Sequence, residues 1–158
     1  MESERPNAIP QQMTADQLPP EAIALAGRLF DAARNGQMDI FEATLQRGRL
    51  ANLTNDKGDS LVMLAAYHGH GPLVRLLLQH GADPNRLNDR GQSPLAGVVF
   101  KNERECVLAL LEGGADPLIG EPSALDACKV FKQEEFEGLF REQIEKLKVN
   151  GHTNGGES

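Results

Sequence analysis

The apolar residues of this chain fall into short clusters, each with the spacing of one face of an α-helix. In the clearest segment an apolar run over residues 61–66 is followed by a second over residues 73–78. Ser60 can cap the first helix through its hydroxyl, Pro72 suits a first helical turn, and Gly81 can end the second helix in a left-handed conformation. The pattern predicts a pair of short helices.

This helix pair recurs along the chain. Residues 60–69 return in degraded form as residues 93–102, a step of 33 residues from Ser60 to Ser93. The same step relates residues 32–36 to 65–69, while a weaker fourth copy begins at Ser123, 30 residues after Ser93. Units of this length bury their apolar faces against one another, so the repeat predicts a solenoid.

Three stretches resemble the ankyrin repeat: Asn-Asp-Lys-Gly-Asp-Ser at residues 55–60, and the segments 64–70 and 76–85. The resemblance covers roughly residues 21–141 and implies an all-α solenoid of about four helix-turn-helix units with projecting turns. The family's Thr-Pro-Leu-His tetrad reads Ser-Leu-Val-Met at residues 60–63 and Ser-Pro-Leu-Ala at 93–96. Because the tetrad histidine ties neighbouring turns together in the family, we expect looser turns here.

The ends of the chain differ in composition from the repeats. We expect a flexible N-terminal arm over residues 1–18, a repeat domain over 19–149 and a disordered tail over 150–158. The repeat units are expected at approximately residues 21–55, 56–88, 89–120 and 121–149. The last unit ends in a closing helix whose apolar stripe should pack against the third unit.

Charge and composition limit the classes of partner. The net charge is −7, which argues against nucleic acid, because binding to a phosphate backbone needs clustered Lys and Arg. It suits a basic protein partner or simply keeps the chain in solution, and most of the acidic surplus lies in residues 89–158. No apolar stretch reaches the roughly 18 residues that span a membrane. Two cysteines are too few for a disulfide framework, which favours the cytoplasm, with the nucleus as an alternative.

No residue pattern points to catalysis, a metal or a cofactor, so we expect a protein that is not an enzyme. The nearest match to a nucleophile elbow places Ser93 before Pro94 and Leu95, where the motif needs a glycine. The histidines and cysteines show no zinc spacing. Cys106 and Cys128 are expected to be small core residues.

The candidate binding residues come from the resemblance. Partners of ankyrin proteins usually contact the turn tips and the exposed end of each first helix. By position, these residues are Arg34 and Asn35 in the first unit, Asp56, Lys57, Asp59, Tyr67 and His68 in the second, and Asp89, Arg90, Gln92, Phe100 and Lys101 in the third. Tyr67 and Phe100 share the 33-residue step and are either interface anchors or partly buried between neighbouring first helices.

Three functions remain open at this point. The first is an adaptor, scaffold or inhibitor that is monomeric when free and binds a folded protein in its concave groove. The second is an escort for a basic client, such as a ribosomal protein. The third is an accessory subunit of a larger assembly, docked through the ends or back of the solenoid.

Overall fold

The computed structural model describes residues 19–45 and 50–157, with side chains up to residue 150. Within these ranges the fold consists of helices joined by turns, and the predicted N-terminal arm lies outside them. The helices are α1 (Pro20–Asn35), α2 (Asp39–Thr44), the 3-10 turn η3 (Leu50–Asn52), α3 (Leu61–Tyr67), α4 (Gly71–Gln79), α5 (Pro94–Lys101), α6 (Arg104–Glu112), α7 (Ala124–Phe131) and α8 (Glu134–Glu157).

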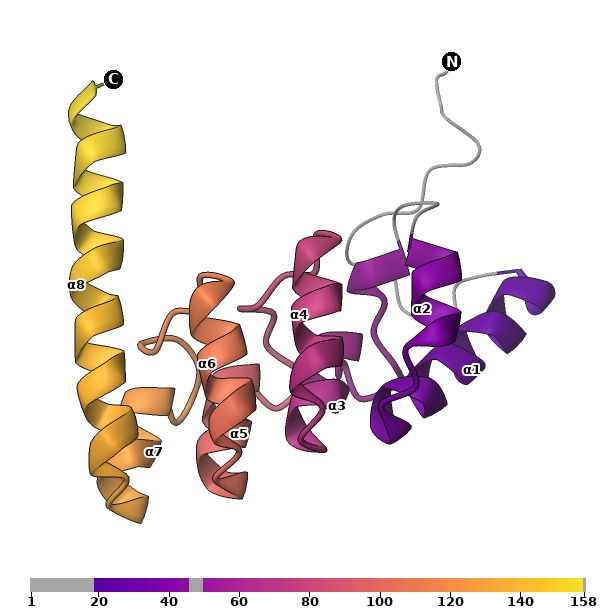
Figure 1. The fold of residues 1–158 in the computed structure, drawn as a ribbon, viewed down its shortest axis with the longest axis horizontal. Helices are drawn as coiled ribbons and strands as arrows, with labels where there is room; N and C mark the ends of the chain where they lie inside the picture. Colours follow the sequence, from indigo (N-terminus) through magenta and orange to yellow (C-terminus); the bar gives the residue numbers. More distant parts are fainter. Residues whose placement is uncertain (1–18, 46–49, 158) are drawn as a thin grey trace.

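The helices form two rows that run along the long axis of the molecule (Figure 1). The first helices α1, α3, α5 and α7 pack on one another in sequence order, and α4 packs on α6 in the second row. Each pair is held together across the rows, as α3 is with α4, α5 with α6 and α7 with α8. The predicted all-α solenoid of helix pairs is therefore confirmed.

The predicted caps begin three of the first helices. The Oγ atoms of Ser60, Ser93 and Ser123 accept hydrogen bonds from the backbone N–H groups three residues later, at 3.2, 3.1 and 3.1 Å. Each cap contributes about 1 kcal/mol by satisfying one otherwise free helical N–H group. At the other end, Gly81 follows α4 with φ +94°, the left-handed conformation expected for it.

Small and branched side chains fill the space between the rows. Leu61, Val74, Leu95 and Leu110 are fully buried or nearly so. Cys106 has no exposed surface, and Cys128 likewise has none, so both are core residues as expected. The core is continuous from the first unit to the last.

Neighbouring units are tied by hydrogen bonds that repeat with the sequence. The Oδ1 atom of Asn52 accepts from the N–H of Asp83 at 2.7 Å, and that of Asn85 accepts from the N–H of Asp116 at 2.7 Å. The turn tips are also joined, because the N–H of Asp89 donates to the Lys57 carbonyl at 3.1 Å. Backbone and asparagine groups thus connect the units where the tetrad histidine is missing.

His70 provides a further connection between units one and two. Its Nε2 lies 2.8 Å from the carbonyl oxygen of Arg34 at the end of α1. The imidazole also covers Gly36, where a Cβ would lie 2.5 Å from Nδ1 and φ is +72°. Gly36 is therefore required both by its backbone conformation and by the close approach of His70.

The closing helix α8 stands at the end of the solenoid opposite α1 (Figure 1). Phe136 and Phe140 are buried, as expected for its apolar stripe. Gln143 donates through Nε2 to the carbonyls of Leu111 and Ala115, both at 3.0 Å, which fixes α8 to the third unit. No helix in the described ranges is long and apolar enough to cross a membrane.

The C-terminal boundary differs from the expected one. Instead of giving way to a tail at residue 150, α8 continues to Glu157. The residues beyond 150 include Gly151, Gly155 and Gly156, each of which costs a helix about 1 kcal/mol, so the sequence pattern did not predict this extension.

Candidate functional site

A groove of about 510 Å³ opens beside the first helices of units two, three and four. We call it the aromatic groove, and most of its lining is apolar. The apolar lining residues are Met63, Leu64, Tyr67, Pro94, Ala96, Gly97, Phe100, Pro122, Ala127 and Phe131. The polar lining residues, Asp59, Asn88, Arg90, Gln92 and Ser93, all come from the turns and the cap positions.

Three aromatic side chains in this groove are exposed to solvent. Phe100 is 59 % exposed, Phe131 45 % and Tyr67 39 %. These rings are only partly covered by their neighbours, so burial in the core does not account for them. Exposed aromatic residues of this kind are typical of binding surfaces.

Each exposed ring contacts a neighbouring side chain, and two of these contacts join successive units. The rings of Phe100 and Phe131 meet edge to face, with centroids 5.4 Å apart and planes at 68°. The Lys101 Nζ lies 4.9 Å from the centre of the Tyr67 ring, and the His68 imidazole packs edge-on against Tyr67 at 5.7 Å. The side chains at the ends of α3, α5 and α7 therefore form one connected strip.

Hydrogen bonds of Asn88 fix the turn side of the groove. Its Nδ2 donates to Asp59 Oδ1 at 2.9 Å and to Gln92 Oε1 at 2.8 Å. Its Oδ1 accepts from the N–H groups of Arg90 and Gln92, both at 3.0 Å. Because Asn88 is itself buried, it holds Asp59 and Gln92 in fixed positions at the rim.

Some of the predicted binding residues line the aromatic groove and others lie outside it. Asp59, Tyr67, Arg90, Gln92 and Phe100 line the aromatic groove, and His68 and Lys101 contact its Tyr67 wall. Seven predicted residues are not among those that line it, because His68 and Lys101 contact the Tyr67 wall without lining the groove. Of these, Asp56, Lys57 and Asp89 are exposed on the turn tips, while Arg34 and Asn35 end α1, with Arg34 paired to Asp31 at 2.9 Å.

Sequence reasoning missed part of the lining, above all Phe131 in the fourth unit. The step from the third to the fourth unit is 30 residues, so Phe100 corresponds to Val130 and Lys101 to Phe131. The fourth unit therefore has no aromatic residue at the position that Tyr67 and Phe100 share. Val130 is 71 % exposed. An exposed pair of apolar residues at the end of α7 extends the strip into a unit that the resemblance covered only partly.

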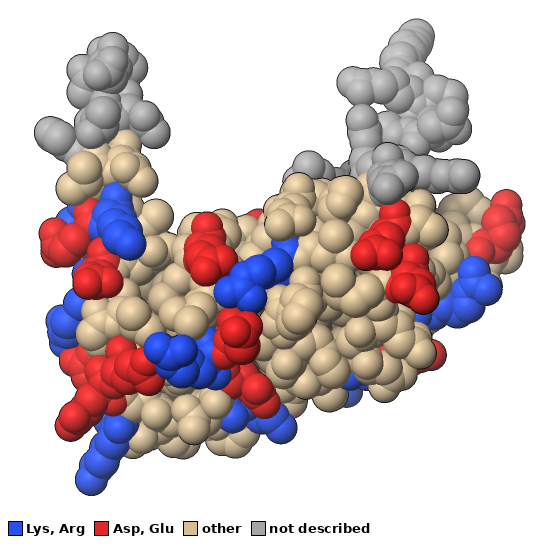
Figure 2. All heavy atoms as spheres, in the orientation of Figure 1, with Lys and Arg blue, Asp and Glu red and all other residues tan. Residues whose placement is uncertain are grey.

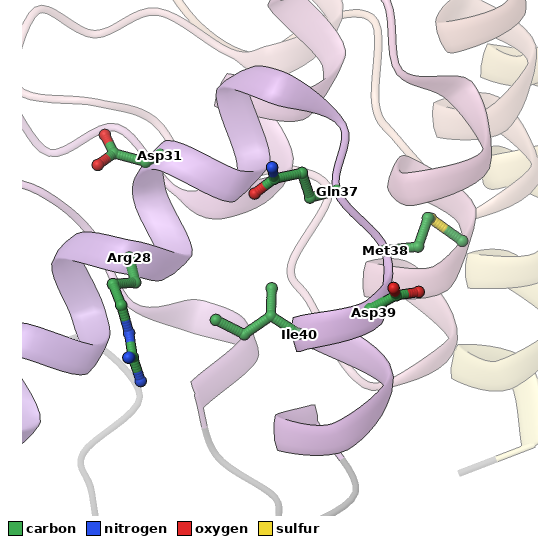
Figure 3. A pocket seen from close by; sticks show the side chains of 6 residues that line it. All are labelled: Arg28, Asp31, Gln37, Met38, Asp39 and Ile40. Carbon is green, nitrogen blue, oxygen red and sulfur yellow. The ribbon is translucent and has the colours of Figure 1, made fainter.

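A second hollow of about 580 Å³ lies between α1 and α2. Arg28, Asp31 and Asp39 border it together with Gln37, Met38 and Ile40. The labelled side chains point in different directions and do not converge on a common point (Figure 3). This arrangement offers no set of groups that would grip one ligand.

The outer surface carries paired charges. Arg75 on α4 bonds Glu105 and Glu112 on α6, each at 3.1 Å, and these carboxylates raise the pKa of its guanidinium. Arg104 pairs with Glu135 on α8 at 2.7 Å. Figure 2 shows acidic and basic side chains next to one another toward the α8 end of this face. Ion pairs therefore engage several carboxylates of the C-terminal half, and Arg75 reaches Glu105 and Glu112 from outside it.

The described residues offer little for chemistry. Among them no three His, Cys, Asp or Glu side chains are grouped to hold a metal ion. Burial raises the pKa of the Cys106 thiol to about 11 and that of Cys128 to about 11. Both thiols stay protonated near neutral pH, and a protonated buried thiol is a poor nucleophile.

Comparison with known proteins identifies the class. A family model described as ankyrin repeats in three copies matches residues 29–120, more than half of the chain. The chain therefore belongs to the ankyrin repeat family, whose repeats generally mediate protein–protein interaction.

A Pseudomonas aeruginosa protein whose name describes it as an ankyrin repeat protein is 56 % identical over 48 residues. The matched segment covers 30 % of this chain and 28 % of that protein.

Proposed function

We propose that this chain is a non-catalytic interaction module that binds a protein partner in the aromatic groove. In this role it acts as an adaptor, a scaffold or an inhibitor. The observation that carries the proposal is the strip of exposed rings at the ends of α3, α5 and α7, with Phe100 at its centre.

Energetics favour the groove over the rest of the surface. Binding hot spots are rich in aromatic residues and lie near the centre of an interface, ringed by contacts that exclude water. Phe100 is flanked by Tyr67 and Phe131, and the turn residues Asp59 and Arg90 form a polar rim. The outer helices instead present arginines already paired with glutamates, and such exposed pairs contribute little to binding.

The proposal is tested by replacing Tyr67 and Phe100 together with alanine and measuring capture of stoichiometric partners from a native extract. We expect the double variant to lose a partner that the parent chain retains. Both side chains are exposed, so the variant should keep the helical circular dichroism and the urea midpoint of the parent within a small margin.

The matched control replaces Ile23 and Leu118, which are 41 % and 54 % exposed and lie outside the groove. This control should bind as the parent does. A partner retained by the Tyr67 and Phe100 variant, or lost equally by both double variants, would contradict binding through the groove.

The alternative of an escort for a basic client rests on the net charge of −7. Such a complex would weaken steeply as salt rises, because screening acts on exposed charges. Docking as an accessory subunit would use α8, and a partner captured by the Tyr67 and Phe100 variant would support that role. Measuring capture at low and high salt separates these functions from the groove-binding adaptor.

A further inference from the structure

In the aromatic groove, unit three carries small residues where unit two carries large ones. Along the 33-residue step, Met63 and Leu64 of α3 correspond to Ala96 and Gly97 of α5. Ala127 of α7 also lines this region. The small residues Ala96 and Gly97 leave room in the hollow that the rings of Tyr67, Phe100 and Phe131 also line.

Gly97 is an unfavourable residue for its backbone position. It lies in the middle of α5, where glycine costs about 1 kcal/mol relative to alanine. Its φ is not in the left-handed region, and a Cβ would meet only Tyr67 Cδ1 at an ordinary 3.5 Å. Neither backbone conformation nor close packing requires glycine here, so the feature that the residue provides is space beside the Tyr67 ring in the lining of the groove.

The charged side chains near this hollow are two basic residues and one acidic residue. The ammonium of Lys101 lies over the Tyr67 ring, and Arg90 lines the turn side and is exposed. Asp59 is the acidic residue of the lining, and its Oδ1 already accepts a hydrogen bond from Asn88. Arg90 and Asp59 balance within the lining, and Lys101 over the Tyr67 ring makes these three side chains net positive, although the whole chain is acidic.

We infer that the hollow over Gly97 is a socket for one bulky apolar side chain of a protein partner, presented next to a carboxylate. The inference rests on the proposed function and adds the chemistry of the partner. The apolar side chain packs between the rings of Tyr67, Phe100 and Phe131. The neighbouring carboxylate pairs with Arg90 and Lys101, as charge complementarity at an interface requires.

The test selects peptides from a random display library against the full chain, followed by titration of the selected peptides as synthetic probes. Tyr67 is the single tyrosine and the chain has no tryptophan, so intrinsic tyrosine fluorescence reports on the groove itself. Peptides without tyrosine or tryptophan are chosen for titration. We expect the selected sequences to share a large aliphatic or phenylalanine side chain beside Asp or Glu.

The decisive variant is Gly97→Leu, which restores the residue type that unit two has at the equivalent position. We expect it to weaken peptide binding at least tenfold without lowering the melting temperature, because it fills the socket and favours the helix. Gly138→Leu is the matched control, since Gly138 lies in α8 and a Cβ there would meet nothing within 4 Å. This control should leave binding unchanged.

The charge of the partner is tested by the Arg90→Glu, Lys101→Glu double variant. Selection on this variant should enrich peptides with Lys or Arg beside the apolar residue. Enrichment of the same acidic peptides on both chains would overturn the assigned carboxylate.

Failure of the socket is distinguishable from failure of the groove. Peptides that need Tyr67 and Phe100 yet bind Gly97→Leu normally would overturn the socket and leave the proposed function standing. Selection that yields no peptide dependent on Tyr67 and Phe100 would overturn both. If the chain dimerises and Gly97→Leu abolishes this dimerisation, then a second copy of the chain, and not a partner protein, occupies the hollow.

Discussion

The ring of Phe131 in the fourth unit packs edge to face against the ring of Phe100 in the third, with centroids 5.4 Å apart. One unit earlier, Lys101 covers the ring of Tyr67 in the same way. Counted from the serine caps, Phe131 and Lys101 occupy equivalent positions, and so do Phe100 and Tyr67. The last residue of α5 and the last residue of α7 thus each contact the aromatic residue of the preceding unit.

This relationship predicts a measurable coupling between the two phenylalanines. In a double-mutant cycle of Phe100→Ala and Phe131→Ala, we expect a coupling free energy of about 0.5 kcal/mol, the low end for aromatic pairs, because both rings are half exposed. Urea unfolding of the four chains measures it. Additive effects of the two substitutions would show that the ring contact contributes nothing to stability.

Asn88 is predicted to be the most sensitive polar residue at the rim of the groove. Asn88→Ala removes a buried side chain that donates to Asp59 and Gln92 and accepts from two backbone N–H groups. Leaving a buried polar group unpaired costs about 1–3 kcal/mol. We therefore expect Asn88→Ala to lower the unfolding free energy by an amount in that range.

The control for Asn88 is Gln92→Ala, because Gln92 is exposed and its side chain accepts one of those bonds. It should lower the urea midpoint much less. Equal losses for the two variants would mean that the rim is held by the turn backbone and not by the Asn88 side chain.

Gln143 is predicted to determine how firmly α8 is attached. Gln143→Leu keeps the approximate volume but leaves the carbonyls of Leu111 and Ala115 without their donor. We expect a destabilisation of about 1–3 kcal/mol and faster hydrogen exchange in α8. Glu142→Ala, at a neighbouring exposed position, should change neither. Unchanged exchange in Gln143→Leu would assign the attachment of α8 to Phe136 and Phe140 instead.

The two buried thiols make stability depend on pH in the alkaline range. Their folded-state pKa of about 11 lies above the ordinary value of 9.0, so the folded chain holds these protons where the unfolded chain releases them. The contribution of the two thiols to the unfolding free energy should therefore be fully present below about pH 9. It should fall as pH rises toward 11, by at most about 1.4 kcal/mol per pH unit for each thiol.

The alkaline loss is checked by urea unfolding at several pH values for the parent chain and for Cys106→Ala. The variant should lose stability less steeply with pH, although its midpoint at neutral pH is lower because of the space left in the core. In the folded parent chain, a thiol reagent at pH 8 should modify both cysteines slowly. Parallel pH dependences in the two chains would contradict the role of Cys106.

The amino-acid sequence by itself determined the repeat, the helix pairs and the caps. These features depend on residues close together in the chain: Ser60 bonds an N–H group three residues away, and Gly81 adopts its own left-handed conformation. The step from Ser60 to Ser93 was therefore enough to predict the solenoid and the equivalence of Tyr67 and Phe100, whereas the exposure of the two rings was left open. Local interactions of this kind are the same wherever a segment lies in the fold.

The tertiary structure alone decided which of these residues form one site. Phe131 joins Phe100 only because α7 packs on α5 at a particular offset, and the shortened 30-residue step conceals this in the sequence. The hollow over Gly97 likewise exists only between rings from three different units. How far a groove opens depends on the volumes of side chains distant in the sequence and on the stacking of the helices that carry them, and neither can be read from a repeat pattern.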